Sequence, residues 1–231
     1  MIYIIIGLVI IIPISGFFCF KIGKNNAMST IMDMFMKFGY TSKVDAFKVL
    51  NTHIRKHGIV FVGDSITQDY NVYEYFNGSN VYNRGIGGDT SIGVYNRLKE
   101  SVYDLNPKKV FLQIGTNDLQ MTEDNVEKIH DRFKKIIDNI KTFDNEIEIY
   151  ILSVYPVNAL IDPITVGKRR NEQILILNDL NKKISNTIYI DIYSSLIKDG
   201  VLNQAYTLEG LHLNQKGYEI VTNILEKYVK E

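Results

Sequence analysis

Four side chains of this sequence have the chemistry of a nucleophilic site: Ser65, Asn117, Glu209 and His212. A serine hydroxyl is a weak nucleophile until a base accepts its proton, and histidine titrates close to neutral pH. Glu209 stands three residues before His212, where its carboxylate can hold the imidazole tautomer and stabilise the imidazolium. Asn117 carries two N–H donors. These residues make a site only if the fold brings them together.

Ser65 follows a short apolar run, Ile-Val-Phe-Val at 59–62, that stops at Gly63. Such a run predicts a buried strand that delivers a hydroxyl to the turn at its carboxyl end. Open α/β sheets bind their ligands at this end of the strands. Gly-Asp-Ser also occurs in ordinary turns, so the weight of the motif depends on the later segments.

The second segment, Asn-Arg-Gly-Ile-Gly-Gly-Asp-Thr-Ser at 83–91, has glycine at positions 85, 87 and 88. Glycines let the backbone approach a ligand closely, and Asp89, Thr90 or Ser91 can cap a following helix. A dinucleotide loop is excluded because the third glycine of G-x-G-x-x-G would fall on Thr90. An oxyanion site is the better functional interpretation, and a plain turn is the alternative.

The third and fourth segments place Asn117 and His212 after further strand or loop signals. Asn117 follows a predicted buried strand at 109–114 that stops at Gly115, although Asn-Asp there is also a common turn or helix start. His212 lies in the loop Glu-Gly-Leu-His at 209–212, just before the last helical pattern.

Strand and helix patterns alternate after residue 58. Strands are predicted at 59–63, 81–83, 109–114, 147–152 and 187–191, and helices at 91–103, 124–143, 168–184 and 214–229. This alternation predicts a parallel sheet covered on both faces. The simplest arrangement is a flavodoxin-like three-layer α/β/α sandwich with five parallel strands, and every motif above falls at a carboxyl end of a strand.

Together, these four segments resemble the SGNH (GDSL-type) family of serine hydrolases and esterases, in order from about 59 to 229. The resemblance implies that Ser65 is the nucleophile and His212 the general base and acid. It also implies an oxyanion hole made by the backbone N–H groups of Ser65 and Gly88 and the side-chain amide of Asn117. An α/β-hydrolase is excluded because its G-x-S-x-G motif needs a glycine where Thr67 stands.

The chain departs from the family at one position, because Glu209 replaces the usual aspartate. Its extra methylene either preserves the hydrogen bond to His212 with a shifted backbone, or a loop carbonyl orients the histidine and leaves a dyad. The resemblance implies a carboxylic ester hydrolase that needs no cofactor and no metal.

The N-terminus carries a separate signal. Residues 2–20 contain no charge, which is long enough to cross a bilayer core of about 30 Å. No basic residue precedes the run, so a single uncleaved anchor is favoured over a signal peptide, and Lys21 and Lys24 favour a cytoplasmic domain. We therefore predict an anchor at 1–24, a helical connector at 25–58 and the hydrolase domain at 59–231.

Composition limits the partners. The 26 basic and 26 acidic residues cancel, so no net charge points to nucleic acid. The single cysteine, Cys19, excludes an internal disulfide and a cysteine-based zinc site. The oligomeric state is not predicted.

The substrate is predicted from the loop at 153–168, which carries Tyr155, Pro156, Val157, Leu160, Ile161 and Pro163. This apolar lining suits a short acyl group, so we expect a small-acyl, acetyl-type esterase acting on a glycan or lipid. The family also includes lysophospholipases and thioesterases. An O-acyltransferase would use the same residues, and a non-catalytic binding module is a further alternative. Arg169 and Arg170 could meet an anionic substrate, but a solvated face is the simpler interpretation.

Overall fold

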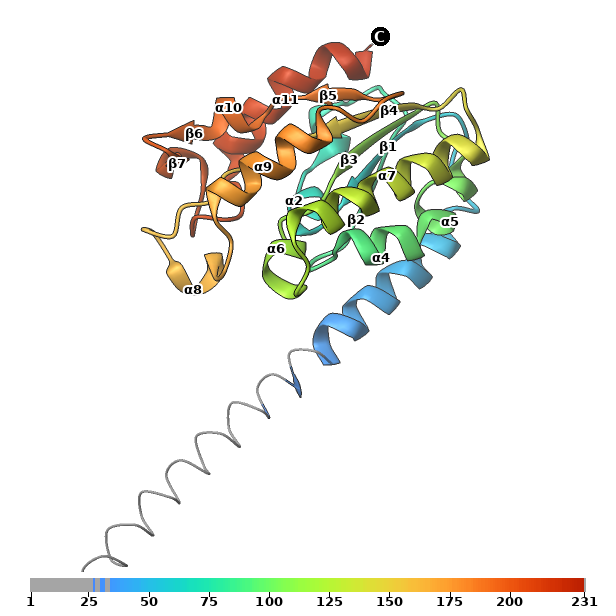
Figure 1. The fold of residues 1–231 in the computed structure, drawn as a ribbon. Coiled ribbons are helices and arrows are strands. Elements are labelled where there is room, and N and C mark those ends of the chain that lie inside the picture. Colours follow the sequence, from blue (N-terminus) through green and yellow to red (C-terminus); the bar gives the residue numbers. More distant parts are fainter. Residues whose placement is uncertain (1–26, 28–29, 32–33, 231) are drawn as a thin grey trace, which may run out of the picture. The chain divides into compact units, whose positions relative to one another are not determined.

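The computed structural model describes residues 27, 30–31 and 34–230, and their contacts divide the chain into a first unit at 1–41 and a second at 42–231. The second unit contains a five-stranded sheet in the order β2-β1-β3-β4-β5, with every pair parallel (Figure 1). Its strands are β1 (Ile59–Gly63), β2 (Val81–Gly85), β3 (Lys109–Gln113), β4 (Glu148–Leu152) and β5 (Ile188–Ile190). This is the flavodoxin-like strand order that the sequence predicts.

Helices connect the strands. They are α2 (Ser65–Gln68), α3 (Val72–Tyr75), α4 (Ser91–Asn96), α5 (Leu98–Ser101), η1 (Tyr103–Leu105), α6 (Asp118–Met121), α7 (Val126–Phe143), α8 (Pro163–Val166), α9 (Asn171–Asn181), α10 (Tyr193–Leu196), η2 (Gln204–Tyr206) and α11 (Gln215–Lys230). A small antiparallel hairpin joins β6 (Ile197–Lys198) to β7 (Val201–Leu202).

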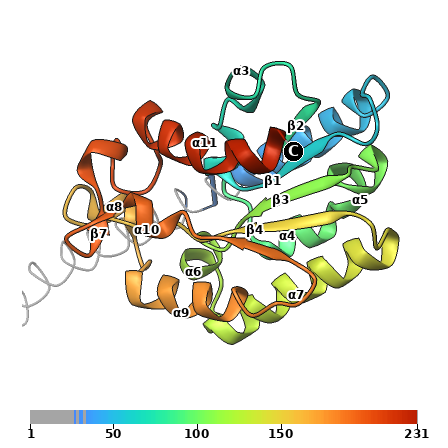
Figure 2. The ribbon, with the colours of Figure 1, turned by 90° about the horizontal axis from the view of Figure 1, so that it is seen from above.

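Two hydrophobic cores cover the two faces of the sheet because side chains alternate along each strand. Val60 and Val62 of β1 belong to a core shared with α4, α5, α7 and α9. Ile59 and Phe61 belong to the opposite core, shared with α2, α3 and α11. Figure 2 shows α11 and α3 on one side of the strands and α4, α7 and α9 on the other. The predicted three-layer arrangement is therefore confirmed.

The α11 side of the sheet carries a row of stacked rings. Phe61, Phe111 and Tyr150 are in register on β1, β3 and β4. Their ring centroids are 4.8 Å apart between Phe61 and Phe111 and 4.6 Å apart between Phe111 and Tyr150. Cross-strand aromatic pairs stabilise one pairing register. They thereby keep the carboxyl ends of these strands in register, and the site is built from those ends.

The elements differ from the sequence prediction at a few boundaries. The helix predicted at 91–103 is divided into α4, α5 and η1, with the break at Arg97, whose φ of −113° and ψ of 20° are not helical. Arg97 is fully buried and its guanidinium turns toward the strand ends, as described below. α8 and the β6–β7 hairpin were not predicted, since both are too short to show a periodic pattern.

In the first unit, residues 34–41 are helical, with Met34, Phe35 and Phe38 exposed. The apolar run at 2–20 lies outside the described residues. Within the described part of the chain, no helix is both long and apolar enough to cross a membrane.

Candidate active site

Ser65 is the first residue of α2, immediately after β1. Its position depends on Gly63, because a Cβ there would lie 2.1 Å from the Gln113 carbonyl oxygen and 2.2 Å from Thr67 Oγ1. Asp64 caps α2 by accepting a hydrogen bond of 2.9 Å from the Ile66 N–H. The first N–H groups of a helix have no intrahelical partner. The Ser65 N–H therefore has no hydrogen-bond partner within α2.

His212 lies in a tight loop closed by the Thr207–Leu213 bridge. Thr207 Oγ1 donates to the His212 carbonyl oxygen at 2.6 Å and accepts from the Gly210 N–H at 2.9 Å. Gly210 has a φ of 88°, and a Cβ there would lie 2.2 Å from the Asn158 carbonyl oxygen. Only glycine fits this position. The loop is thus held against the segment that follows β4.

The structure brings Ser65, His212 and Glu209 into one line. Ser65 Oγ is 2.9 Å from His212 Nε2, and His212 Nδ1 is 2.5 Å from Glu209 Oε1. The same Glu209 oxygen accepts the His212 backbone N–H at 2.8 Å. The longer glutamate side chain therefore reaches the imidazole directly. The sequence left two groups that could orient the imidazole, the Glu209 carboxylate and a loop carbonyl. In the structure the carboxylate contacts His212 Nδ1.

The three glycines at 85, 87 and 88, at the end of β2 and in the loop after it, have different roles. Gly88 has a φ of 72°, whereas a Cβ on Gly85 would lie 2.1 Å from the Gln68 backbone nitrogen. The Gly87 N–H donates to Gln68 Oε1 at 3.1 Å. Gly85 and Gly87 thus serve the packing of this loop against α2, rather than an approach to a ligand. Thr90 is the N-cap of α4.

Asn117 is the N-cap of α6 and is buried. Its Nδ2 donates to the Asp89 carbonyl oxygen at 2.9 Å, so the amide lies against the loop that carries Gly88. Its Oδ1 accepts from Arg169 Nη2 at 2.7 Å. Asn117 and the glycine loop are therefore in contact in the structure.

A second buried arginine ties the strand ends together. Arg97 Nε pairs with Asp89 Oδ2 at 2.7 Å, and its Nη2 donates to the Gly63 carbonyl oxygen at 2.9 Å. Its Nη1 donates to the Arg84 carbonyl oxygen at 2.7 Å. Arg97 therefore connects the turn before Ser65, the end of β2 and the residue after Gly88. Burial raises the pKa of Asp89, and Arg97 opposes that shift.

The geometry can be compared with known proteins. Residues 61–220 match the model of the GDSL-like lipase/acylhydrolase family. The chain belongs to this family. Its membership confirms the predicted SGNH (GDSL-type) resemblance and the prediction of a carboxylic ester hydrolase.

Two curated relatives of this acylhydrolase cover most of its length. The N-acylneuraminate cytidylyltransferase of Escherichia coli O18:K1:H7 is 31% identical over 201 residues, which are 81% of this chain and 46% of that protein. The chain thus spans less than half of that relative. The platelet-activating factor acetylhydrolase IB subunit alpha2 of Rattus norvegicus is 27% identical over 197 residues, which are 79% of this chain and 84% of that protein.

Solved structures share the fold. A Streptococcus pneumoniae protein named for platelet activating factor superposes with a TM-score of 0.81 at 27% identity, covering 88% of this chain and 99% of that one. A GDSL-like lipase of Bacteroides thetaiotaomicron has a TM-score of 0.70 at 22% identity, covering 81% and 97%. The second likeness concerns the fold alone.

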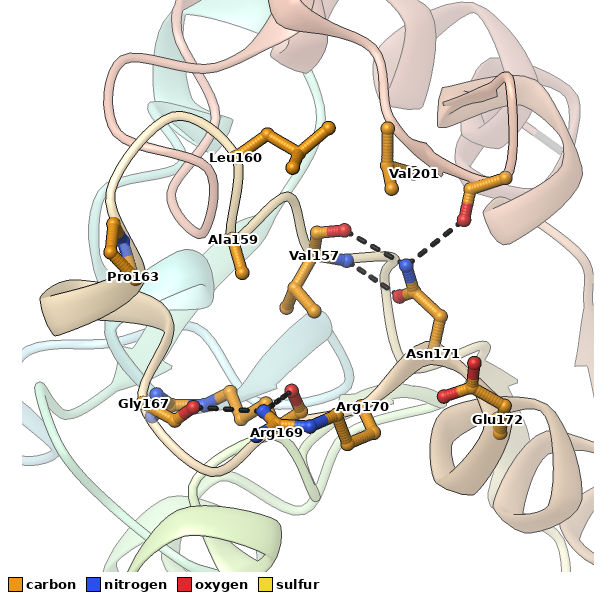
Figure 3. Close-up of a pocket in the computed structure, with 11 residues that line it drawn as sticks. Val157, Ala159, Leu160, Pro163, Gly167, Arg169, Arg170, Asn171, Glu172 and Val201 are labelled. Atoms are coloured by element: carbon orange, nitrogen blue, oxygen red, sulfur yellow. Dashed lines mark hydrogen bonds between the residues drawn. The ribbon is translucent and has the colours of Figure 1, made fainter.

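The loop at 153–168 buries some of its apolar side chains and exposes others. Tyr155 is buried in the core on the α11 side of the sheet, and Val157 is buried in the core on the other side. Leu160, in contrast, is 87% exposed. A cavity of about 370 Å³ lies between this loop and α9 (Figure 3). Its walls include Val157, Leu160, Pro163, Arg169 and Asn171.

No group of three or more His, Cys, Asp or Glu side chains in the described chain could hold a metal ion.

Sequence reasoning missed Arg97 and misjudged Arg169. Arg97 stands in an amphipathic helical pattern, where an arginine usually faces solvent. The solvated face suggested for Arg169 and Arg170 holds only for Arg170, since Arg169 is 4% exposed. Nothing in local spacing distinguishes a buried arginine from an exposed one, because its partners come from distant segments.

Asp64 carries an unpaired buried oxygen that makes the stability of the acylhydrolase depend on pH. The residue is fully buried, Oδ2 has no hydrogen-bond partner, and burial raises the pKa of its carboxyl to about 7. A raised carboxyl pKa means that the folded state holds a proton that the unfolded state loses near pH 4. Stability from this group is complete below that pH and is lost as the pH rises toward 7.

We expect Asp64→Asn to remove this loss. At pH 8 the free energy of unfolding of the variant should exceed that of the wild type, by at most about 4 kcal/mol for a shift of about three pKa units. The difference should shrink as the pH falls toward 4. Urea unfolding of both proteins between pH 4 and pH 8 measures it, and parallel stability curves would contradict the prediction.

Proposed function

We propose that this chain is a serine esterase that removes small acyl groups, acetyl first, from hydroxyls of a glycan or lipid. The observation that carries the proposal is the line from Ser65 Oγ through His212 to Glu209, with contacts of 2.9 and 2.5 Å. A nucleophile, its base and the group that orients the base are then within hydrogen-bond reach of one another.

In the proposed mechanism, Ser65 Oγ attacks the ester carbonyl carbon while His212 Nε2 accepts the hydroxyl proton. The Glu209 carboxylate holds Nδ1–H and stabilises the imidazolium. The carbonyl oxygen becomes an oxyanion that accepts hydrogen bonds from the N–H groups of Ser65 and Gly88 and from Asn117 Nδ2. The alcohol leaves with the proton from Nε2. Water then attacks the carbonyl carbon of the acyl-enzyme and gives a proton to His212. His212 passes this proton to Ser65 Oγ as the carboxylic acid is released.

The proposal of a small acyl group rests on the loop after β4, whose apolar side chains are partly packed into the cores. Tyr155 and Val157, which follow β4, are buried rather than open to a long chain. The name of the rat relative, an acetylhydrolase, supports an acetyl group. The name of the Escherichia coli relative contains N-acylneuraminate, which supports a sugar as one carrier of that group.

A chain-length series tests the proposed acyl preference. We expect kcat/KM of the full-length chain to fall at least about tenfold from p-nitrophenyl acetate to p-nitrophenyl octanoate, since a closed pocket rejects added methylenes. The Ser65→Ala variant supplies the background rate. A kcat/KM that rises with chain length would contradict the small-acyl proposal and favour a lysophospholipase-type substrate.

We also propose that residues 2–20 anchor the enzyme in a membrane. The 19 uncharged residues support it, and the exposed apolar side chains at 34–38 are compatible with a nearby lipid surface. Such an anchor would place lipid or envelope glycan within reach of the site.

A further inference from the structure

Arg169 is a buried cation that forms no ion pair in the described part of the chain, and the carboxyl group whose charge acts on it is that of Asp64. Arg169 is 4% exposed, and in the described part of the chain no Asp or Glu oxygen lies within ion-pair distance of its guanidinium. Burying an arginine in this way is costly. Arg97, by comparison, is paired with Asp89. The position of Arg169 therefore calls for an explanation beyond surface solvation.

All the partners of Arg169 are neutral oxygens around the exit of β3 and its own loop. Nε donates to the Thr116 carbonyl oxygen at 2.9 Å and Nη2 to Asn117 Oδ1 at 2.7 Å. Nη1 donates to the carbonyl oxygens of Thr165 at 3.1 Å and Val166 at 3.0 Å. The guanidinium thus binds the backbone before Asn117 and the side chain of Asn117 at the same time.

This contact determines which way the Asn117 amide faces. One Nδ2–H is used by the Asp89 carbonyl oxygen, and Oδ1 is held by Arg169. A rotation of the amide by 180° would place its NH₂ group against the guanidinium, donor against donor. The amide therefore has one orientation, and its second N–H points in one fixed direction within the amide plane.

The charge of Arg169 acts on that second N–H. A cation that donates to an amide oxygen polarises the amide and strengthens its N–H as a donor, because hydrogen bonds in a chain reinforce one another. In a buried environment the same positive charge also favours nearby negative charge. Both effects would be greatest when an oxyanion forms beside Asn117.

We propose that Arg169 is a positioning residue that orients and polarises the Asn117 amide for oxyanion stabilisation. This inference rests on the proposed esterase mechanism. It makes the loop before α9 part of the machinery for transition-state stabilisation, although Arg169 itself does not touch the reacting atoms. Arg169 also lines the cavity of Figure 3.

The test is a double-substitution cycle in the full-length chain with p-nitrophenyl acetate. We expect Arg169→Ala to lower kcat by about 10²- to 10³-fold, as loss of an oxyanion donor does, with KM changed less than about threefold. Asn117→Ala should have a similar effect. The double variant should be no slower than Asn117→Ala, since the role of Arg169 ends when the amide is absent.

Two further variants separate orientation from folding. Arg169→Lys keeps the charge but not the paired donors, so its kcat should fall between those of the wild type and Arg169→Ala. Added guanidinium ion at millimolar concentration should raise the kcat of Arg169→Ala at least about fivefold, by analogy with restoring a charge-assisted donor, and leave Asn117→Ala unchanged. Arg170→Ala is the matched control, because Arg170 is exposed and its guanidinium donates to the carbonyl oxygens of Gly167 and Arg169.

The outcomes distinguish this inference from the proposed function. An unchanged kcat in Arg169→Ala, or a loss that multiplies with that of Asn117→Ala, would overturn the role of Arg169 while leaving the esterase mechanism in place. If Asn117→Ala and Ser65→Ala are as active as the wild type, the proposed mechanism itself is wrong, and the inference is overturned with it. If Arg169→Ala does not fold, Arg169→Lys and its own cycle with Asn117→Ala decide the question.

Discussion

Ser65→Ala should lower the turnover number for p-nitrophenyl acetate by about 10⁴- to 10⁶-fold, the range seen when a serine nucleophile is removed. The reason is that, among the residues that the structure describes, Ser65 supplies the hydroxyl in contact with His212 Nε2, at 2.9 Å. The oxyanion donors would remain, so a residual rate above that of water is expected. Stopped assays of nitrophenolate release with the full-length chain measure the change.

The fold should not change with this substitution. Asp64, not Ser65, caps α2, and its bond to the Ile66 N–H does not involve the serine hydroxyl. Unfolding midpoints of the two proteins should therefore agree closely. Ser195→Ala, at an exposed position, is the matched control and should keep full activity. Equal turnover in Ser65→Ala and the wild type would contradict the proposed mechanism.

The second large effect is expected at His212. His212→Ala removes the base that contacts Ser65, so its loss in kcat should match that of Ser65→Ala, because residues that act as one unit give losses that do not add. The double variant should be no slower than either single one. An additive loss would mean that the two residues work in separate steps.

The loss in kcat of Glu209→Gln should be at least about tenfold smaller than that of His212→Ala. One oxygen, Oε1, accepts both the His212 N–H and Nδ1–H, and an amide oxygen can keep both bonds. What is lost is the negative charge that stabilises the imidazolium. Steady-state kcat of both variants provides the comparison, with the exposed Glu219→Gln as control. Equal losses would show that the charge of Glu209 is as necessary as the base.

Much of the fold could be predicted from local patterns. The five strands are short apolar runs that end in glycine or polar residues, and each lies within a few residues of its predicted position. α7 and α11 show apolar residues at helical spacing over four or more turns. Short elements such as α8 and the β6–β7 hairpin could not be predicted because two to four residues carry no period.

The candidate site divides in the same way. Ser65, Asn117 and His212 could be proposed because each follows a strand or loop signal, and the family resemblance added Gly88 and the role of each residue. The burial of Arg97 and Arg169 could not be predicted from the sequence, for a physical reason. An arginine in a helical or loop pattern looks solvated until its partners are known, and these partners come from other strand ends.

By itself, the sequence determined the order of strands and helices and the chemical types at the strand ends, because local propensity and periodicity act over a few residues. It also led to Ser65 and His212 as the proposed nucleophile and base, and to the acylhydrolase family. Only the tertiary structure decided that Glu209 reaches His212, that Gly85 is needed for packing, and that Arg169 holds the Asn117 amide. These outcomes depend on atoms brought together from segments far apart in the chain, where distance and burial rather than spacing set the interaction.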